Sequence, residues 1–104
     1  MPESEVIILK IPDKVKIGGH NLDVTVTNNC DEIEYNTIGR TCLGKNVITL
    51  NKNYPQSRQE EALLHEIIHN CLYDLNEEQN EALIVRLGTL LYSVIKDNPD
   101  IFKS

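Results

Sequence analysis

Basic residues are scarce in this sequence. Only 10 Lys and Arg stand against 16 Asp and Glu, so the formal net charge is −6 at pH 7. The basic residues are scattered, and no stripe combines them with aromatic side chains. Because phosphate contacts need clustered Lys and Arg, this composition argues against a general nucleic-acid binder.

Long apolar runs are missing as well. No window approaches the roughly 18 consecutive apolar residues of a membrane-spanning helix. The first residues, MPESEV, lack the basic and apolar regions of a signal peptide. The three cysteines are odd in number and have no CxxC spacing, which indicates reduced thiols: Cys30, Cys42 and Cys71. We therefore predict a cytoplasmic protein that does not act at a membrane.

The chain has two parts that differ in pattern. At 104 residues it is long enough for one domain with a modest core and too short for two. Residues 1–53 are rich in β-branched residues and turn formers, whereas the pattern from residue 57 onward is helical. We predict a single α+β domain over residues 1–104, with about three or four strands followed by two helices.

Four segments of the first part have the pattern of β-strands: residues 5–11, 15–17, 22–27 and 47–50. Gly18-Gly19 separates the second segment from the third, which predicts a hairpin. Residues 44–46 form a turn signal before the last strand. The intervening residues 30–43 are ambiguous, with extended chain expected at three positions: Ile33, Tyr35 and Ile38.

The first predicted helix covers residues 57–75. Its start reads as a capping box, in which Ser57 accepts from first-turn amides and Glu60 reaches back. The main apolar stripe contains Leu64, Ile68, Cys71, Leu72 and Leu75, and Leu63 and Ile67 lie opposite. A helix that is apolar nearly all round is expected to lie buried between two layers.

The second predicted helix covers residues 76–98. Asn76 is the expected N-cap, with Gln79 in the third helical position, and the helix should stop near Asn98-Pro99. Its apolar stripe contains Leu83, Leu87, Leu90, Leu91, Val94 and Ile95. This stripe is expected to pack on the first helix.

The first helix carries an HExxH motif at residues 65–69. His65 and His69 are one turn apart on one face, so both imidazoles can reach one zinc ion at bond lengths of about 2.0–2.1 Å. Glu66 lies about 100° further round, where it can hold and deprotonate a water on the metal. The alternative is a pair of histidines hydrogen-bonded at the edge of the core. That alternative is weaker, because two imidazoles and a carboxylate in a buried helix are costly without a partner.

A catalytic zinc site normally has three protein ligands and an open position. His20 follows a glycine turn and is expected to lie in water, so the better source is the acidic stretch 76–81. With a helix starting at residue 76, Glu77 faces the first helix, and Glu81 follows one turn later. Glu77 is therefore the expected third ligand. Glu81 is the alternative ligand, or a carboxylate that orients a ligand.

The stretch LLHEIIHNCLYDLNEEQNEALIVRLGTLLYSVIKDNP resembles the short metallopeptidase-like proteins of phages and conjugative elements. These belong to the gluzincin group of HExxH zinc peptidases, near the ImmA/IrrE-type enzymes. The resemblance covers about residues 57–99, with weaker similarity at residues 47–50. It implies a small zincin-like fold with a twisted sheet, a helix bearing HExxH and a second helix bearing an acidic ligand.

The resemblance also implies an activity. His65 and His69 match the zinc ligands, Glu66 matches the general base, and Glu77 or Glu81 matches the third ligand. The expected reaction is peptide-bond hydrolysis by a zinc-bound water that Glu66 deprotonates. The substrate is a peptide or protein, aligned as an added strand on an exposed sheet edge. Residues 47–50, just before the HExxH helix, are the candidate edge.

Two other interpretations remain open. The chain has no long insert to build a specificity pocket, and no motif marks a residue that stabilises the transition state; the tyrosine candidates are Tyr35, Tyr54 and Tyr73. A non-catalytic, zinc-stabilised protein-binding module of phage or mobile-element origin would need the same ligands as an enzyme. In the third interpretation, the protein is a metal-free α+β domain and the HExxH pattern is accidental.

Overall fold

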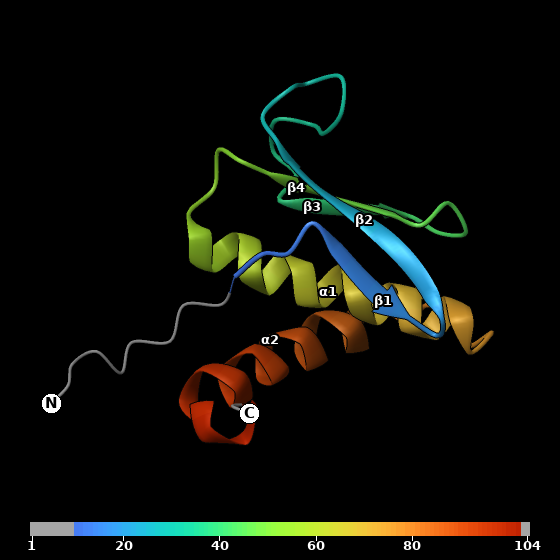
Figure 1. Ribbon diagram of the computed structural model, residues 1–104, viewed down its shortest axis with the longest axis vertical. Coiled ribbons are helices and arrows are strands. Elements are labelled where there is room, and N and C mark those ends of the chain that lie inside the picture. The colour runs from blue at the N-terminus through green and yellow to red at the C-terminus, as the bar shows by residue number, and fades with distance from the viewer. Residues whose placement is uncertain (1–9, 103–104) are drawn as a thin grey trace, which may run out of the picture.

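A computed structural model describes residues 10–102, which form a mixed sheet, a helix packed on that sheet and a second helix packed on the first. The strands are β1 (Lys14–Ile17), β2 (His20–Thr27), β3 (Gly39–Cys42) and β4 (Val47–Asn51). The helices are α1 (Gln56–Asp74) and α2 (Glu81–Asp97), followed by the 3-10 turn η2 (Pro99–Phe102). Helix α1 lies between the sheet and α2 (Figure 1). The predicted α+β class is confirmed, and so is the burial of the first helix between two layers.

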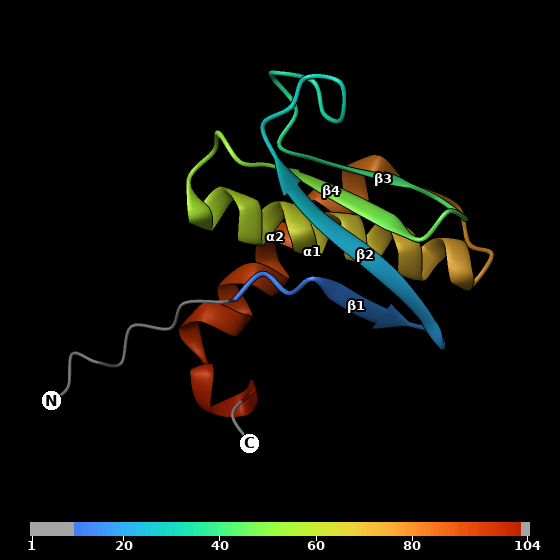
Figure 2. The same ribbon diagram turned by 45° about the horizontal axis from the view of Figure 1, so that its top comes forward.

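The strand order is β1-β2-β4-β3. Strands β1 and β2 form the predicted antiparallel hairpin, with Gly18 and Gly19 at positive φ in its turn. Strand β4 pairs in parallel with β2 and antiparallel with β3. Residues 47–50 therefore occupy the interior of the sheet, and the prediction that they form its exposed edge is wrong. The two edge strands are β1 and β3, and both contact α1 (Figure 2).

The other strand predictions had mixed outcomes. Residues 5–9 of the segment predicted at 5–11 lie outside the described residues, and Lys10 and Ile11 are not in a strand. In the ambiguous segment 30–43, the strand begins only at Gly39. Ile33 and Tyr35 lie in a bend and a turn, and Ile38 directly precedes β3, so none of the three belongs to a strand.

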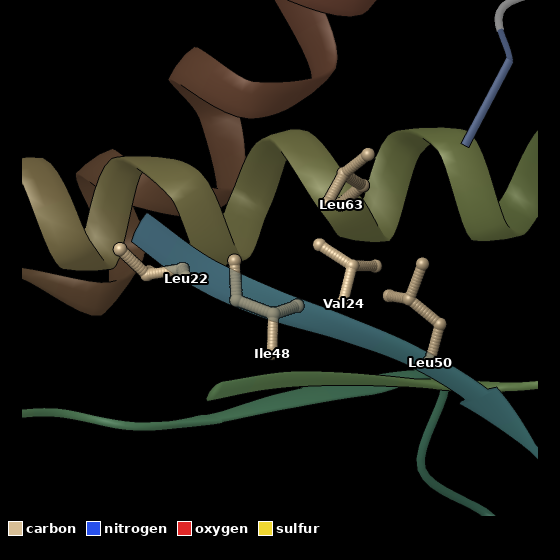
Figure 3. Close-up of a cluster of buried hydrophobic side chains, with 5 residues drawn as sticks. All are labelled: Leu22, Val24, Ile48, Leu50 and Leu63. Atoms are coloured by element: carbon tan, nitrogen blue, oxygen red, sulfur yellow. The ribbon is translucent and has the colours of Figure 1, made fainter. Parts of the chain in front are cut away.

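The apolar core lies between the sheet and α1. Leu22 and Val24 of β2, with Ile48 and Leu50 of β4, project towards Leu63 of α1 (Figure 3). All five side chains are buried, and each contributes about 1.5–3 kcal/mol by leaving water. This packing fixes α1 against the sheet.

Helix α1 begins at Gln56, and its N-cap is Pro55, which makes no side-chain capping bond. The predicted capping box at residues 57–60 is therefore wrong. Glu60 is instead buried, and its carboxylate accepts hydrogen bonds from Tyr92 of α2 at 2.6 Å and from Gln56 at 3.2 Å. The carboxylate thus ties the two helices together.

Helix α2 begins at Glu81, after an N-cap that lies four residues later than the predicted one. Asn76 has a φ of 58°, the Glu77 N–H donates to the Leu72 carbonyl, and the Asn76 N–H donates to the Tyr73 carbonyl. These two bonds form a Schellman motif that ends α1. The true N-cap is Asn80, whose side chain accepts from the Leu83 N–H at 3.1 Å.

The residues that α2 buries are Ile84 and Gly88. Most of the apolar stripe predicted to pack on the first helix is instead exposed. We name this surface the α2 apolar face: Leu83, Leu87, Leu90, Leu91 and Val94. No helix among residues 10–102 combines the length and the apolar character needed to cross a membrane.

Candidate metal centre

Two histidines and one glutamate converge between α1 and the start of α2. His69 Nε2 lies 2.9 Å from one carboxylate oxygen of Glu81, and His65 Nε2 lies 3.1 Å from the other. The two Nε2 atoms are 3.2 Å apart. The structure therefore brings Glu81 to the histidine pair predicted from the sequence, while Glu77 lies outside this group.

The cluster could hold one metal ion, because one ligand atom from each of its three residues lies within 4.8 Å of the others. Tetrahedral zinc with bonds of about 2.0–2.1 Å holds its ligand atoms about 3.3–3.4 Å apart. The three observed separations, 2.9, 3.1 and 3.2 Å, are slightly shorter, and they join four atoms because each histidine faces a different oxygen of Glu81. The histidine side chains are 23% and 17% exposed, whereas that of Glu81 is 61% exposed. One side of the cluster is therefore open to water, and a fourth ligand can enter there.

Hydrogen bonding does not explain the cluster if neither ring carries a hydrogen at Nε2. A carboxylate oxygen carries no hydrogen, and an unprotonated Nε2 only accepts. Unprotonated nitrogens and carboxylate oxygens that lie 2.9–3.2 Å apart in pairs repel one another unless positive charge lies between them. A shared proton or a metal ion can supply that charge.

Glu66 lies next to the histidine pair with its side chain buried. Burial raises the pKa of its carboxyl to about 7, His69 opposes this shift, and Glu81 reinforces it. The other buried polar side chains of α1 are hydrogen-bonded, but no described hydrogen bond from residues 10–102 reaches the Glu66 carboxylate. Burial is also the main cause that lowers the pKa of His65.

Gln79 was not predicted to take part in the site. The sequence places it within a helix, whereas the structure places it in the linker between α1 and α2, half-buried against His69. Its Oε1 lies 2.8 Å from His69 Nδ1, and its Nε2 donates to the His69 carbonyl at 3.0 Å. No local pattern signals this contact, because it depends on the path of the linker.

The remaining candidates lie elsewhere. Glu77 and Glu78 are exposed in the linker. His20 is exposed at the start of β2, as expected, with Nε2 3.9 Å from the Asp74 carboxylate. The tyrosine candidates line neither of the two cavities beside the cluster: Tyr35, Tyr54 and Tyr73.

Two neighbouring cavities flank the cluster, and both are lined by Gly39, His65 and Glu66. The first, of about 440 Å³, extends between α1, α2 and the chain leading into β3. The second, of about 380 Å³, lies between β3 and the cluster, and His69 and Glu81 line it as well. Together they offer a path along β3 past the candidate metal ligands.

Comparisons with known proteins do not assign the chain to a family. No family model matches it, and neither a curated protein nor a solved structure matches it. The functional argument therefore depends on the geometry of the site.

Proposed function

We propose that this protein is a zinc-dependent peptide hydrolase. The observation that carries the proposal is the convergence of His65 Nε2, His69 Nε2 and the Glu81 carboxylate at separations that one metal ion could bridge, beside a buried glutamate. The HExxH spacing and the resemblance to phage and conjugative-element metallopeptidases support the same function. The three cysteines are unpaired, which fits the proposed cytoplasmic location.

Zinc held by these residues would polarise a peptide carbonyl and acidify a water molecule. Glu66 would accept the proton of that water and pass it to the leaving amine. A carboxyl whose pKa lies near the working pH can both take and release a proton. Burial raises the pKa of the Glu66 carboxyl to about 7 in the metal-free protein. A bound cation would lower this pKa, which favours the ionised carboxylate that accepts a proton.

The substrate would bind as an extended peptide along β3. This strand pairs with β4 alone among the described strands, so its other side can accept an added strand. The cavity beside β3 leads from this edge to His65, His69 and Glu81. The larger cavity, with Ala62 and Val85 in its wall, has room for a side chain next to the cleaved bond.

The decisive experiment measures zinc and hydrolysis in the same preparations. Protein purified without chelator should carry close to one zinc per chain by mass spectrometry. The zinc-loaded protein is then incubated with a library of unstructured peptides, and cleavage is read by mass spectrometry. Glu66→Gln should keep the zinc and lower cleavage by at least about 100-fold, because the proton acceptor is lost.

The exposed linker residue Glu78 provides the matched control. Glu78→Gln removes the same charge and should leave zinc content and cleavage unchanged. If Glu66→Gln cleaves as fast as the wild type, the hydrolase mechanism is wrong. If the wild type carries no zinc after reconstitution, the metal site is wrong as well.

The third ligand is tested by two alanine variants. We expect Glu81→Ala to weaken zinc binding beyond the roughly 10- to 100-fold that follows loss of an orienting residue. Glu77→Ala should bind zinc like the wild type, since this side chain lies outside the cluster. Competition with a chromophoric chelator measures both affinities. The reverse ranking would return the ligand role to Glu77.

A zinc-stabilised protein-binding module is the second candidate. The α2 apolar face favours it, because five exposed apolar side chains on one helix form a surface suited to a partner protein. Zinc retention without cleavage of any peptide would support this module over the hydrolase. The cleavage assay on the zinc-loaded wild type therefore separates the two functions.

A further inference from the structure

Gln79 contacts both the ring and the backbone of His69. Its side-chain nitrogen donates to the His69 main-chain carbonyl at 3.0 Å, and its side-chain oxygen lies 2.8 Å from Nδ1 of the ring. No other described side chain hydrogen-bonds Nδ1 of either histidine in the cluster. The two rings are therefore held differently, and Gln79 acts on only one of them.

The chemistry of these contacts fixes the orientation of the Gln79 amide. A main-chain carbonyl only accepts hydrogen bonds, so the atom of Gln79 that faces it must be the NH2 group. The amide oxygen then faces His69 Nδ1. An amide oxygen also only accepts, so Nδ1 must carry the hydrogen. A neutral His69 ring consequently has its lone pair on Nε2.

That lone pair is directed towards the cluster. Nε2 of His69 is the atom that lies 2.9 Å from Glu81 and 3.2 Å from His65 Nε2. A metal ligand must present a lone pair, and the hydrogen bond at the other ring nitrogen decides which nitrogen does so. The Gln79 contact therefore prepares Nε2 to bind a cation.

Hydrogen bonds fix the linker just before and just after Gln79. Before it, the Schellman motif at Asn76 and Glu77 closes the end of α1. After it, Asn80 caps the first turn of α2. The same linker delivers Glu81, so the contact that orients His69 and the third candidate ligand come from one short segment.

We propose that Gln79 is a positioning residue of the metal centre, which fixes the Nδ1–H tautomer of His69 and thereby presents Nε2 to the metal. The inference rests on the proposed function for its metal. The tautomer itself is a property of the metal-free protein, so it can be tested separately.

The test compares Gln79→Met, which removes both hydrogen-bonding groups, with Gln79→Glu, which keeps an acceptor. Nitrogen-15 NMR of the histidine rings is recorded on metal-free protein near pH 8.5, well above the usual histidine pKa of about 6.5. We expect the Nδ1–H form of His69 in the wild type and in Gln79→Glu. Gln79→Met should populate both tautomers.

Zinc affinity is then measured by competition with a chromophoric chelator. We expect Gln79→Met to bind zinc about 10- to 100-fold more weakly, and Gln79→Glu to recover most of that loss. Glu78→Met, at the exposed neighbouring position, should match the wild type in tautomer and affinity. Circular dichroism confirms that each variant is folded.

Three results would overturn the inference. The first is an Nε2–H tautomer in wild-type His69. The second is a Gln79→Met variant that keeps the wild-type tautomer, or one that loses it without any change in zinc affinity. The third is a wild type that binds no zinc although His69 shows the Nδ1–H form. This last result overturns the proposed function together with the metal role of Gln79, and the NMR spectra distinguish it from the other two.

Discussion

Helices α1 and α2 pack against each other, yet they bury side chains of opposite character. Helix α1 buries four polar or charged residues together with a single leucine: Gln59, Glu60, Glu66 and Asn70, with Leu63. Helix α2 buries Ile84 and Gly88 and exposes the leucines of the α2 apolar face. Amphipathic patterning predicts the apolar side to be buried, so both helices depart from the rule.

Position in the layers explains the difference. Helix α1 has a neighbour on two sides, so polar side chains are enclosed even where they are not in the apolar core. Asn70 reaches the Thr41 hydroxyl of β3, and Gln59 reaches the Tyr54 carbonyl. Helix α2 has α1 as its neighbour and no described strand. Most of its surface therefore faces water whatever residues it carries.

One of the four buried polar residues of α1 differs from the rest. Gln59, Glu60 and Asn70 have described hydrogen-bond partners for their side chains. Glu66 has none among residues 10–102, and burial raises its pKa to about 7. Glu66 also lines both cavities beside the cluster, and a mostly buried carboxyl with a shifted pKa in a cavity wall is expected at a functional site.

The largest effect on stability is expected at Ile84 of α2, and its neighbour Leu83 provides the comparison. Ile84 is 1% exposed and Leu83 is 55% exposed. Ile84→Ala should lower the free energy of unfolding by about 2–4 kcal/mol, because it leaves a cavity against α1. Leu83→Ala should cost less than about 1 kcal/mol. Urea unfolding measures both, and equal losses would show that the α2 apolar face is covered in solution.

The pH dependence of stability isolates Glu66. Its folded pKa is about 7, above the reference value of 4.5, so the folded state binds more protons between these values. Metal-free wild type should lose stability as pH rises through this window, whereas Glu66→Gln should not. The variant should equal the wild type near pH 4 and exceed it near pH 8 by up to about 3 kcal/mol. Parallel curves for the two proteins would show that Glu66 has an ordinary pKa.

The link between the two helices is tested at Tyr92. Its hydroxyl donates to the buried Glu60 carboxylate at 2.6 Å. Tyr92→Phe keeps the ring and removes this bond to a charged group, so we expect a loss of about 2 kcal/mol. Tyr35 is 81% exposed, and Tyr35→Phe is the matched control with no expected change. Thermal unfolding measures both variants. Equal losses of stability would show that the Tyr92–Glu60 bond does not hold the helices together.

The smallest effect is expected at Asn70. Its side chain donates to the Thr41 hydroxyl at 2.9 Å and to the Glu66 carbonyl at 2.8 Å. Asn70→Ala loses both bonds but gains helix propensity, so the expected cost is about 1 kcal/mol. A double-mutant cycle with Thr41→Val, read by urea unfolding, should show a coupling energy above about 0.5 kcal/mol. Additive losses would mean that this contact does not hold α1 to β3.

Features encoded by neighbouring residues could be predicted from the sequence. The hairpin follows from two apolar segments around Gly18-Gly19, and these segments do pair as antiparallel strands. The one-turn spacing of His65 and His69 places both rings on one face of any helix that contains them. Their side-chain nitrogens do meet, 3.2 Å apart.

The third carboxylate could not be predicted in the same way. The stretch NEEQNE contains two asparagines, and either one can cap a helix or adopt a left-handed conformation. Asn76 followed by Gln79 has the better local capping pattern, yet it ends α1, and Asn80 starts α2. Moving the N-cap by four residues, from Asn76 to Asn80, exchanges Glu77 for Glu81 in front of the histidines. The edge strand was missed for a related reason, because GRTC at residues 39–42 has no apolar alternation and becomes a strand only by pairing with β4.

The sequence by itself determined the periodic elements: a hairpin, a strand at residues 47–50 and a helix carrying HExxH. These depend on contacts between residues a few positions apart, and such contacts leave a pattern in the chain. Tertiary structure alone decided the start of α2, the edge of the sheet, the exposure of the leucines and the contact of Gln79 with His69. Each of these depends on which surfaces meet across the layers, and the free energy of that packing exceeds the small differences between alternative caps and strand ends.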